Sequence, residues 1–319
     1  AQYMYNCPQY LESLFATFKA GLAPVNTNYR YTADELVYIW DNADVVAVVF
    51  HGIFAETIEQ LRHRVPRVVL WLWVDDASGQ CPSWATDYET AAQLGTSTNI
   101  SGPSNVSGPW GRTGDDLLLL YTGGTTGMPK GVMWRQGDAL TECFGASREA
   151  TTIADLLAAT PGRRALIAPP FMHGAGHWVA FGTWNAGGTV FIPSIPERLD
   201  AHDMWSTVER EKIDFFLIVG DAFARPLIDQ LRVANYDLSS LTVLLSGGAI
   251  LSVHLKEELL QLLPHVMIID GLGSSEAGGQ LTHASGHGVA TTGRFPLSPQ
   301  NHVLDADFTR LLSPGHSET

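Results

Sequence analysis

The amino-acid sequence predicts an α/β fold with two doubly wound, mainly parallel sheets and helices on both faces. Short, fully apolar segments rich in branched side chains recur along the 319 residues, and helical segments alternate with them. This alternation is typical of parallel strands that helices cover on both sides. With 45% hydrophobic and 16% charged residues, the chain has the composition of a globular protein with a sizeable core.

Helix boundaries give clear local signals. Pro8 suits the first turn of a helix and Gly21 suits its end. Thr32 and Glu35 have the spacing of a capping box, which predicts a second helix from Thr32 onward. Asp221 and Ser252 are expected to cap two later helices. The other predicted helices lie around 58–61 and over 138–149, 177–185 and 200–212.

Strands are predicted wherever a short apolar run occurs. These runs are 45–50, 68–74, 117–120, 165–168, 189–192, 215–219, 241–245 and 266–270. We expect residues 1–114 to form a first α/β subdomain that lacks its N-terminal opening and ends in an irregular excursion over 76–114. Residues 115–286 should form a second α/β subdomain, and a small β-rich region should begin at 287–319.

Charge and cysteine content exclude several classes of function. The formal net charge is −14, with 19 basic against 33 acidic residues, so we expect no nucleic-acid partner. No apolar run approaches the length of a transmembrane segment. Cys7, Cys81 and Cys143 lie far apart and match no metal-binding spacing, which predicts reduced thiols in a cytoplasmic protein.

The most distinctive stretch runs from Tyr121 to Gly131 and reads Tyr-Thr-Gly-Gly-Thr-Thr-Gly-Met-Pro-Lys-Gly. Its glycines let the backbone approach a ligand, and its threonines and Lys130 supply hydrogen-bond donors. A donor-rich loop that leaves a strand suits an anionic phosphate. The motif of P-loop NTPases does not match, because Lys130 is followed by glycine instead of serine or threonine.

This stretch resembles the phosphate-binding motif of the adenylate-forming superfamily, which contains acyl-CoA synthetases, peptide-synthetase adenylation domains and firefly luciferase. Every defined position of that motif is present, so a surface loop without a ligand is the weaker alternative. The resemblance implies an N-terminal-domain fold of that superfamily and a loop that binds ATP. The loop residues implied are Thr122, Gly123, Gly124, Thr125, Thr126, Gly127 and Lys130.

A second motif, from Asp270 to Glu276, resembles the Tyr-Gly-x-Thr-Glu motif of the same superfamily. The resemblance implies that Ser275 contacts the α-phosphate and that Glu276 helps hold Mg²⁺, a hard cation that carboxylates suit. A solvated turn or a helix-capping glutamate is the alternative. Leu272 replaces an aromatic residue that stacks on adenine in the family, which puts stacking in doubt. The implied nucleotide-binding residues are Asp270, Gly271, Leu272, Gly273 and Ser275.

Two shorter stretches complete the expected site. Ser246 precedes Gly247, Gly248 and Ala249, which match the family's stretch beside the adenine and the acyl pocket, although a tight turn is the alternative reading. The segment from Pro170 to Gly176 resembles Pro-x-Phe-His-x-x-Gly, with one residue of offset. All four stretches follow predicted strands, where open α/β sheets bind ligands.

The histidine of that segment, His173, is implied to lie near the reacting carboxylate and the thiol entry. His173 and His177 have the spacing of a metal pair, but no third ligand follows. Trp178 and Phe181 read as core residues of the helix or as part of an acyl pocket.

The resemblance covers nearly the whole chain and implies ATP-dependent activation of a carboxylic acid, followed by transfer to coenzyme A. Lys130, His173 and Glu276 are the implied catalytic residues. The sequences of these motifs are most similar to those of actinobacterial ligases for long-chain fatty acids or steroid side-chain acids, which indicates lipid metabolism. An adenylation module that loads a carrier protein, and a non-catalytic nucleotide-binding domain, stay open as alternatives.

The family's ribose-binding Thr-Gly-Asp stretch and its C-terminal domain with a catalytic lysine have no counterpart in these residues. We therefore expect the chain to represent the central part of the large N-terminal domain and to be unable to complete the reaction alone. The expected partners are the acid, ATP with Mg²⁺, and coenzyme A. A homodimer is one assembly that fits.

Overall fold

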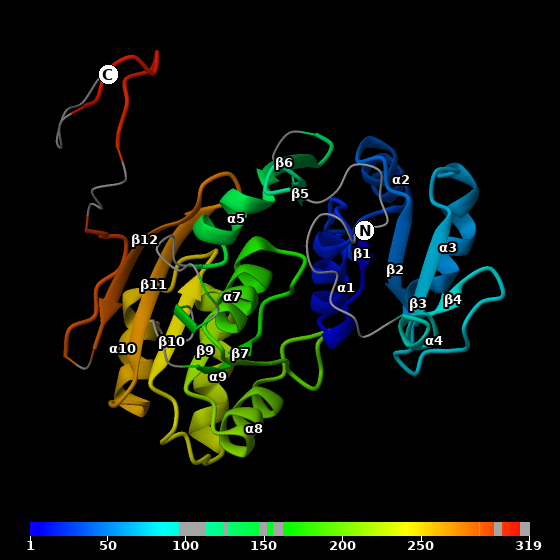
Figure 1. The fold of residues 1–319 in the computed structure, drawn as a ribbon. Coiled ribbons are helices and arrows are strands. Elements are labelled where there is room, and N and C mark those ends of the chain that lie inside the picture. The colour runs from blue at the N-terminus through cyan, green and yellow to red at the C-terminus, as the bar shows by residue number, and fades with distance from the viewer. Residues whose placement is uncertain are drawn as a thin grey trace.

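The computed structural model describes residues 1–95, 113–123, 127–146, 152, 154–155, 162–286, 288–296 and 302–312. Within these residues the chain forms a four-stranded sheet, a six-stranded sheet and a two-stranded hairpin. Figure 1 shows the four-stranded sheet on the right, the six-stranded sheet on the left, and the hairpin near the top between them. The predicted α/β class with two mainly parallel sheets is confirmed.

The four-stranded sheet is parallel throughout. Its strands, in spatial order, are β1 (Gln2–Tyr3), β2 (Ala47–His51), β3 (Leu70–Val74) and β4 (Thr86–Asp87). The accompanying helices are α1 (Pro8–Lys19), α2 (Ala33–Asn42), α3 (Ala55–Leu61) and α4 (Tyr88–Gln93), with single 3-10 turns η1 (Gly52–Phe54) and η2 (Arg62–Arg64). The capping box of Thr32 and Glu35 is present at the start of α2.

The six-stranded sheet has the order β12-β11-β10-β9-β7-β8, and β12 is the strand that runs antiparallel to its neighbour. Its strands are β7 (Arg164–Ile167), β8 (Thr189–Phe191), β9 (Phe215–Ile218), β10 (Val243–Gly247), β11 (Met267–Ser274) and β12 (Gly278–Ser285). Its helices are α7 (Gly174–Asn185), α8 (Ala201–Glu211), α9 (Gly220–Val233) and α10 (Val253–Leu262).

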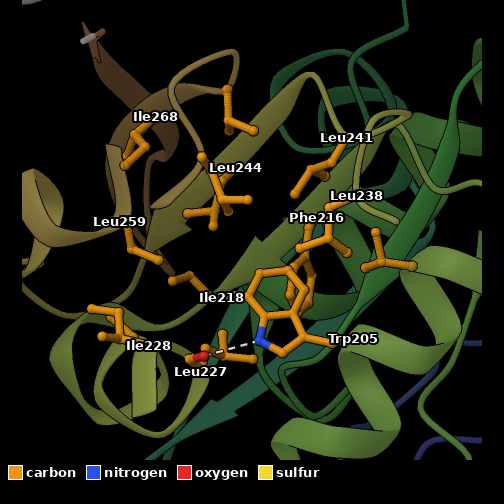
Figure 2. Packing of buried hydrophobic residues seen from close by; sticks show 14 of the residues in the cluster. Trp205, Phe216, Ile218, Leu227, Ile228, Leu238, Leu241, Leu244, Leu259 and Ile268 are labelled. Atoms are coloured by element: carbon orange, nitrogen blue, oxygen red, sulfur yellow. Dashed lines mark hydrogen bonds between the residues drawn. The ribbon is translucent and has the colours of Figure 1, made fainter. Parts of the chain in front are cut away.

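The two faces of the six-stranded sheet bury different clusters. Phe216 and Ile218 of β9 pack with Trp205 of α8 and with residues of α9 and α10, as Figure 2 shows. Leu217, which points to the opposite face because side chains alternate along a strand, packs with Phe181 of α7. Helices therefore cover both faces, as the sequence predicts.

One core cluster joins the two sheets. Val49 of β2, Leu14 of α1, Phe181 of α7 and Leu217 of β9 all belong to it. Its buried members lie on α1 and α7 as well as on strands of both sheets, so these two helices pack between them. Burial of this shared apolar surface fixes how the carboxyl ends of the two sets of strands are placed relative to each other.

The hairpin consists of β5 (Leu117–Thr122) and β6 (Lys130–Arg135), and α5 (Gln136–Glu142) follows it. The predicted leucine strand is confirmed as β5, but the sequence reading misses β6 and places the next helix over 138–149. In the structure that helix begins at Gln136 and ends at Glu142. An antiparallel strand with one exposed face needs no continuous apolar run, so the period-two signal of β6 is easily overlooked.

Of the two expected helix caps, Ser252 is the N-cap residue of α10 as predicted, whereas Asp221 is not the N-cap of α9. Val219 is the N-cap of α9, and the carboxylate of Asp221 instead accepts a 2.7 Å hydrogen bond from the backbone N–H of Ser252. Ser252 does precede α10, but its hydroxyl makes no capping hydrogen bond. The Asp221 carboxylate therefore connects the start of α9 to the start of α10 instead of capping α9. Among the described residues, no helix combines the length and the apolar character that a membrane crossing requires.

Candidate functional site

Two predicted site segments lie side by side at the carboxyl ends of β10 and β11. The hydroxyl of Ser246, at the end of β10, accepts a 3.0 Å hydrogen bond from the backbone N–H of Gly220, at the end of β9. Gly247 is the register partner of Gly271 in the parallel ladder of β10 and β11. Gly248 and Ala249 follow as exposed residues. The predicted adenine stretch therefore lies beside the first glycine of the second motif.

The phosphate loop connects two antiparallel strands. Thr122, the last residue of β5, is the register partner of Lys130, the first residue of β6. Gly123 and Gly127 are exposed at either side of the loop. Three further predicted residues, Gly124, Thr125 and Thr126, lie outside the described residues. The hairpin thus fixes both ends of the loop and presents the exposed Lys130 beside the Thr122 hydroxyl.

The outer residues of the motif, Tyr121 and Gly131, are also register partners. A side chain at Gly131 would place its Cβ atom 3.0 Å from the ring of Tyr121. The Tyr121 hydroxyl donates a 2.5 Å hydrogen bond to the side-chain oxygen of Asn42, which fixes the ring. Glycine is required at position 131 because the tyrosine ring occupies the space above it.

The second motif is a strand and a turn, which differs from the predicted turn directly after residue 270. Strand β11 continues to Ser274, so Gly271, Leu272 and Gly273 lie in the β11–β12 hairpin. Ser275 and Glu276 are the central residues of the tight turn, which the backbone N–H of Ala277 closes onto the Ser274 carbonyl at 3.2 Å. Glu276 is exposed, and Leu272 is 44% exposed.

Asp270 has a different contact from the nucleotide that the motif implies. Its largely buried carboxylate accepts a hydrogen bond from the ammonium of Lys256, a residue that is completely buried. The same ammonium donates to the Thr291 carbonyl and, at 2.9 Å, to the Thr292 hydroxyl. Asp270 therefore helps to hold the segment around residues 291–292 against α10 and β11.

The two histidines of the α7 region have separate environments. His173 is the N-cap of α7 and is solvent-accessible. Partial desolvation, and then the positive charge of Arg30, lower the pKa of His173 below its usual value, which favours the neutral ring. His177 is buried with Nδ1 2.9 Å from the Phe171 carbonyl oxygen, and burial lowers its pKa to about 4.

This placement excludes the two histidines as a metal pair, because His177 belongs to the core. The described parts of the chain contain no group of three His, Cys, Asp or Glu residues that could hold a metal ion. Phe181 is a core residue, as one of the two readings predicts. Trp178 lines a pocket of about 290 Å³ together with Phe144, Val179 and Gly182.

Asn26, Arg30 and Trp134 contribute to the site but were not predicted as site residues. The buried Asn26 accepts a 2.5 Å hydrogen bond from the backbone N–H of Tyr121 and donates to the carbonyls of Tyr121 (2.9 Å) and Met172 (2.7 Å). It thereby joins the start of the phosphate loop to the segment before His173. No local pattern marks Asn26, because its partners are 95 and 146 residues away.

Trp134 makes the corresponding connection on the other side of the hairpin. Its indole Nε1 donates a 2.7 Å hydrogen bond to the carbonyl oxygen of Ser275. The phosphate loop is thus joined by Asn26 to the His173 segment and by Trp134 to the turn that carries Glu276. These contacts bring together residues that the sequence predicts separately.

The donor set fits a polyphosphate with Mg²⁺. Magnesium is usually held by one or two carboxylates together with substrate phosphates and water. Glu276 supplies one exposed carboxylate at the turn, and Lys130 supplies a cation at the hairpin. The arrangement can neutralise a chain of phosphates that lies between the hairpin and the turn.

Comparisons with known proteins show the family to which the chain belongs. A family profile described as AMP-binding enzyme matches residues 1–317. The chain is 38% identical to the medium-chain acyl-CoA ligase Mig of Mycobacterium avium, over 98% of this chain and 57% of that protein. It is 36% identical to a medium/long-chain-fatty-acid and 3-oxocholest-4-en-26-oate CoA ligase of Mycolicibacterium smegmatis, over 92% of this chain and 55% of that one.

Among solved structures, the fold is similar to that of the luciferase-like enzyme of the mealworm Zophobas morio. The TM-score is 0.74 at 16% identity, over 99% of this chain and 71% of that structure. The structural likeness at this identity concerns the fold. The chain spans a little over half the length of the curated relatives named above. Because the family profile extends over residues 1–317, the chain belongs to the family of AMP-binding enzymes.

Proposed function

We propose that the intact protein that contains this chain activates a carboxylic acid with ATP and transfers the acyl group to coenzyme A. The observation that carries the proposal is the junction of two motifs. The hairpin that presents Thr122 and Lys130 is hydrogen-bonded, through Trp134, to the turn that presents Ser275 and Glu276. The names of the relatives as acyl-CoA ligases support the same reaction class.

In the first step, a carboxylate oxygen attacks the α-phosphorus of ATP, the new P–O bond forms, and pyrophosphate leaves with the bridging oxygen. No general base is needed, because a carboxylic acid with a pKa of about 4.3 is already ionised at neutral pH. The barrier comes from bringing two anions together in line. Catalysis therefore depends on neutralising and orienting the phosphates.

The residues of the hairpin and turn divide this work. Lys130 and the backbone N–H groups of its loop would bind the outer phosphates, and the Ser275 hydroxyl would donate to the α-phosphate. Glu276 would hold Mg²⁺, which when bound supplies positive charge against the phosphates. Gly247, Gly248, Ala249 and Leu272 would contact the adenine.

In the second step, the sulfur of coenzyme A attacks the acyl carbon, and AMP leaves with the bridging oxygen. Thiols are mostly protonated at neutral pH, so a proton acceptor near the thiol helps. Desolvation and the charge of Arg30 lower the pKa of His173 and so favour its neutral form. A neutral imidazole at the start of α7 can accept that proton.

For the substrate we propose a fatty acid or a steroid side-chain acid. The relatives' names support this class, and Trp178 and Phe144 line an apolar pocket of about 290 Å³ beside α7. A location in the cytoplasm fits the three cysteines, which are free in the structure. A homodimer, the division into subdomains, and the inability of the 319 residues alone to complete the reaction stay predictions.

The test is a panel of fatty and steroidal acids on the intact protein, read as AMP release with ATP, Mg²⁺ and coenzyme A. We expect acid-dependent AMP release and a matching acyl-CoA product. Transfer to a carrier pantetheine but not to coenzyme A would indicate a carrier-loading adenylation module. ATP binding without acyl-adenylate for any acid would contradict the ligase proposal and favour a non-catalytic nucleotide-binding domain.

A further inference from the structure

The β5–β6 hairpin contacts the β11–β12 turn through one directed side chain. Trp134 donates its indole N–H to the Ser275 carbonyl at 2.7 Å, across 141 residues of sequence. Because side chains alternate along a strand, Trp134 lies on the same face of β6 as Lys130. The face of the hairpin that carries the phosphate-binding lysine is therefore the face that holds the turn.

The backbone of the turn itself defines its position only loosely. The ladder of β11 and β12 is irregular between Leu272 and Gly273, and a bulge locally disrupts strand pairing. Gly273, Gly278 and Gly279 flank the turn, and glycine loses more conformational entropy on ordering than any other residue. A turn built in this way needs external contacts to hold one conformation.

Two contacts of the β11–β12 turn with the segment after the phosphate loop are present, one at Ser275 and one at Gly278. Trp134 holds the Ser275 carbonyl. Gly278, with φ of +72°, lies so close to the end of α5 that an added Cβ would be 2.8 Å from the Glu142 carbonyl oxygen. Both Trp134 and Glu142 belong to the continuous segment that begins at Lys130 and runs through β6 and α5. The position of the turn therefore follows the position of the phosphate hairpin.

We propose that Trp134 is a positioning residue that sets where Ser275 and Glu276 stand relative to Lys130. This inference rests on the proposed function. The carbonyl that Trp134 holds belongs to the planar peptide group between Ser275 and Glu276, so one hydrogen bond constrains the Cα atoms of both residues. A triphosphate chain has a limited span. Its two ends are met only if the hairpin and the turn keep a fixed separation.

The test uses Trp134→Phe in the intact protein. Phenylalanine keeps an aromatic ring at the site but removes the N–H donor. We expect adenylate formation at saturating ATP to slow by about tenfold, since small displacements of reacting groups have effects of this order or larger. The Mg²⁺ concentration for half-maximal rate should rise, and amide hydrogen exchange over residues 273–279 should become faster.

The matched control is Trp205→Phe. Trp205 also donates its indole N–H to a backbone carbonyl, that of Leu227 at 2.9 Å, but within the core under the six-stranded sheet (Figure 2). This variant loses the same kind of bond. We expect it to lower the thermal midpoint while the adenylation rate, the Mg²⁺ titration and exchange over 273–279 stay as in the parent.

The outcomes separate the two proposals. Unchanged exchange over 273–279 in Trp134→Phe overturns the positioning role, whatever the activity. Faster exchange with an adenylation rate equal to that of the parent also overturns it, because the turn would then move without consequence. A parent protein that forms no acyl-adenylate contradicts the proposed function, whereas faster exchange confined to Trp134→Phe would still support the ordering of the turn by the indole.

Discussion

Thr122 and Lys130 are register partners across the β5–β6 hairpin. Paired residues of antiparallel strands project to the same face, with Cβ atoms about 5 Å apart. The hydroxyl and the ammonium of the phosphate motif are therefore presented together by paired backbone, although seven residues separate them in the sequence. The paired strands fix the backbone position from which the Lys130 side chain extends.

Replacing Lys130 by alanine should slow adenylate formation in the intact protein by about 10- to 100-fold, because a hydrogen bond to a charged group contributes about 1.5–3 kcal/mol. Stability should change little, since Lys130 is exposed. Pyrophosphate release measures the rate. Lys212→Ala is the control. Lys212 lies between α8 and the start of β9, at the other end of the strand from the candidate site, and pairs with Asp237 at 2.8 Å. Equal rates for the two variants would refute the assignment.

Glu276→Gln should raise the Mg²⁺ concentration needed for half-maximal adenylation by about tenfold or more, the scale on which changes at metal sites lower affinity. Glutamine keeps the size of the side chain but removes the charge that a hard cation prefers. Magnesium titrations of the adenylation rate measure the effect, with Glu257→Gln on the exposed side of α10 as control. Superimposable titrations for Glu276→Gln and the parent would contradict a role in metal binding.

Lys256→Met should lower the free energy of unfolding by about 3–5 kcal/mol, because it leaves the buried Asp270 carboxylate without its cationic partner. Adding Asp270→Asn should recover part of the loss. Urea denaturation measures both. The exposed pair of Lys212 and Asp237 provides the comparison, since Lys212→Met should cost far less. A similar loss for the two lysine variants would show that burial of the Lys256 pair does not matter.

Stability should also depend on pH through His177. Its pKa falls from the ordinary 6.5 to about 4 on folding. Between these values the unfolded chain binds a proton that the folded protein does not, so the stabilisation is complete above pH 6.5 and is lost as pH falls toward 4. From pH 7 to pH 5 this residue should lower the free energy of unfolding by about 2 kcal/mol.

Urea denaturation at the two pH values measures that difference. His177→Gln cannot titrate, so its loss of stability over the same interval should be smaller by about that amount. An equal pH dependence of the unfolding free energy in the variant and the parent would show that the pKa of His177 does not change on folding.

Much of the fold can be predicted because parallel strands buried on both faces need continuous apolar runs. The runs at 45–50, 215–219 and 241–245 correspond to β2, β9 and β10. The antiparallel partners β6 and β12 escaped prediction. β12 begins with two glycines and has no continuous apolar run, so it owes its strand conformation to pairing with β11, a tertiary effect that local propensity does not contain.

The candidate site divides in the same way. The glycine-rich motifs could be singled out as candidates, because glycine allows a backbone to approach a ligand closely, and their role in binding stays a prediction. The residues that join the motifs could not. Asn26 and Trp134 act through hydrogen bonds to backbone carbonyls of distant segments, and any carbonyl can accept such a bond. Their roles depend on which segments the packed core brings together.

Asn26 has a consequence for the order in which the protein is made. A nascent chain emerges from its N-terminus and tends to fold in that order. The Asn26 amide leaves the ribosome long before Tyr121 and Met172, its partners in the folded protein. Until those residues have been synthesised, the amide can form hydrogen bonds with water. The junction closes only after parts of both large sheets exist. A chain that ends before Met172 therefore lacks one of the Asn26 hydrogen bonds and cannot form the complete junction.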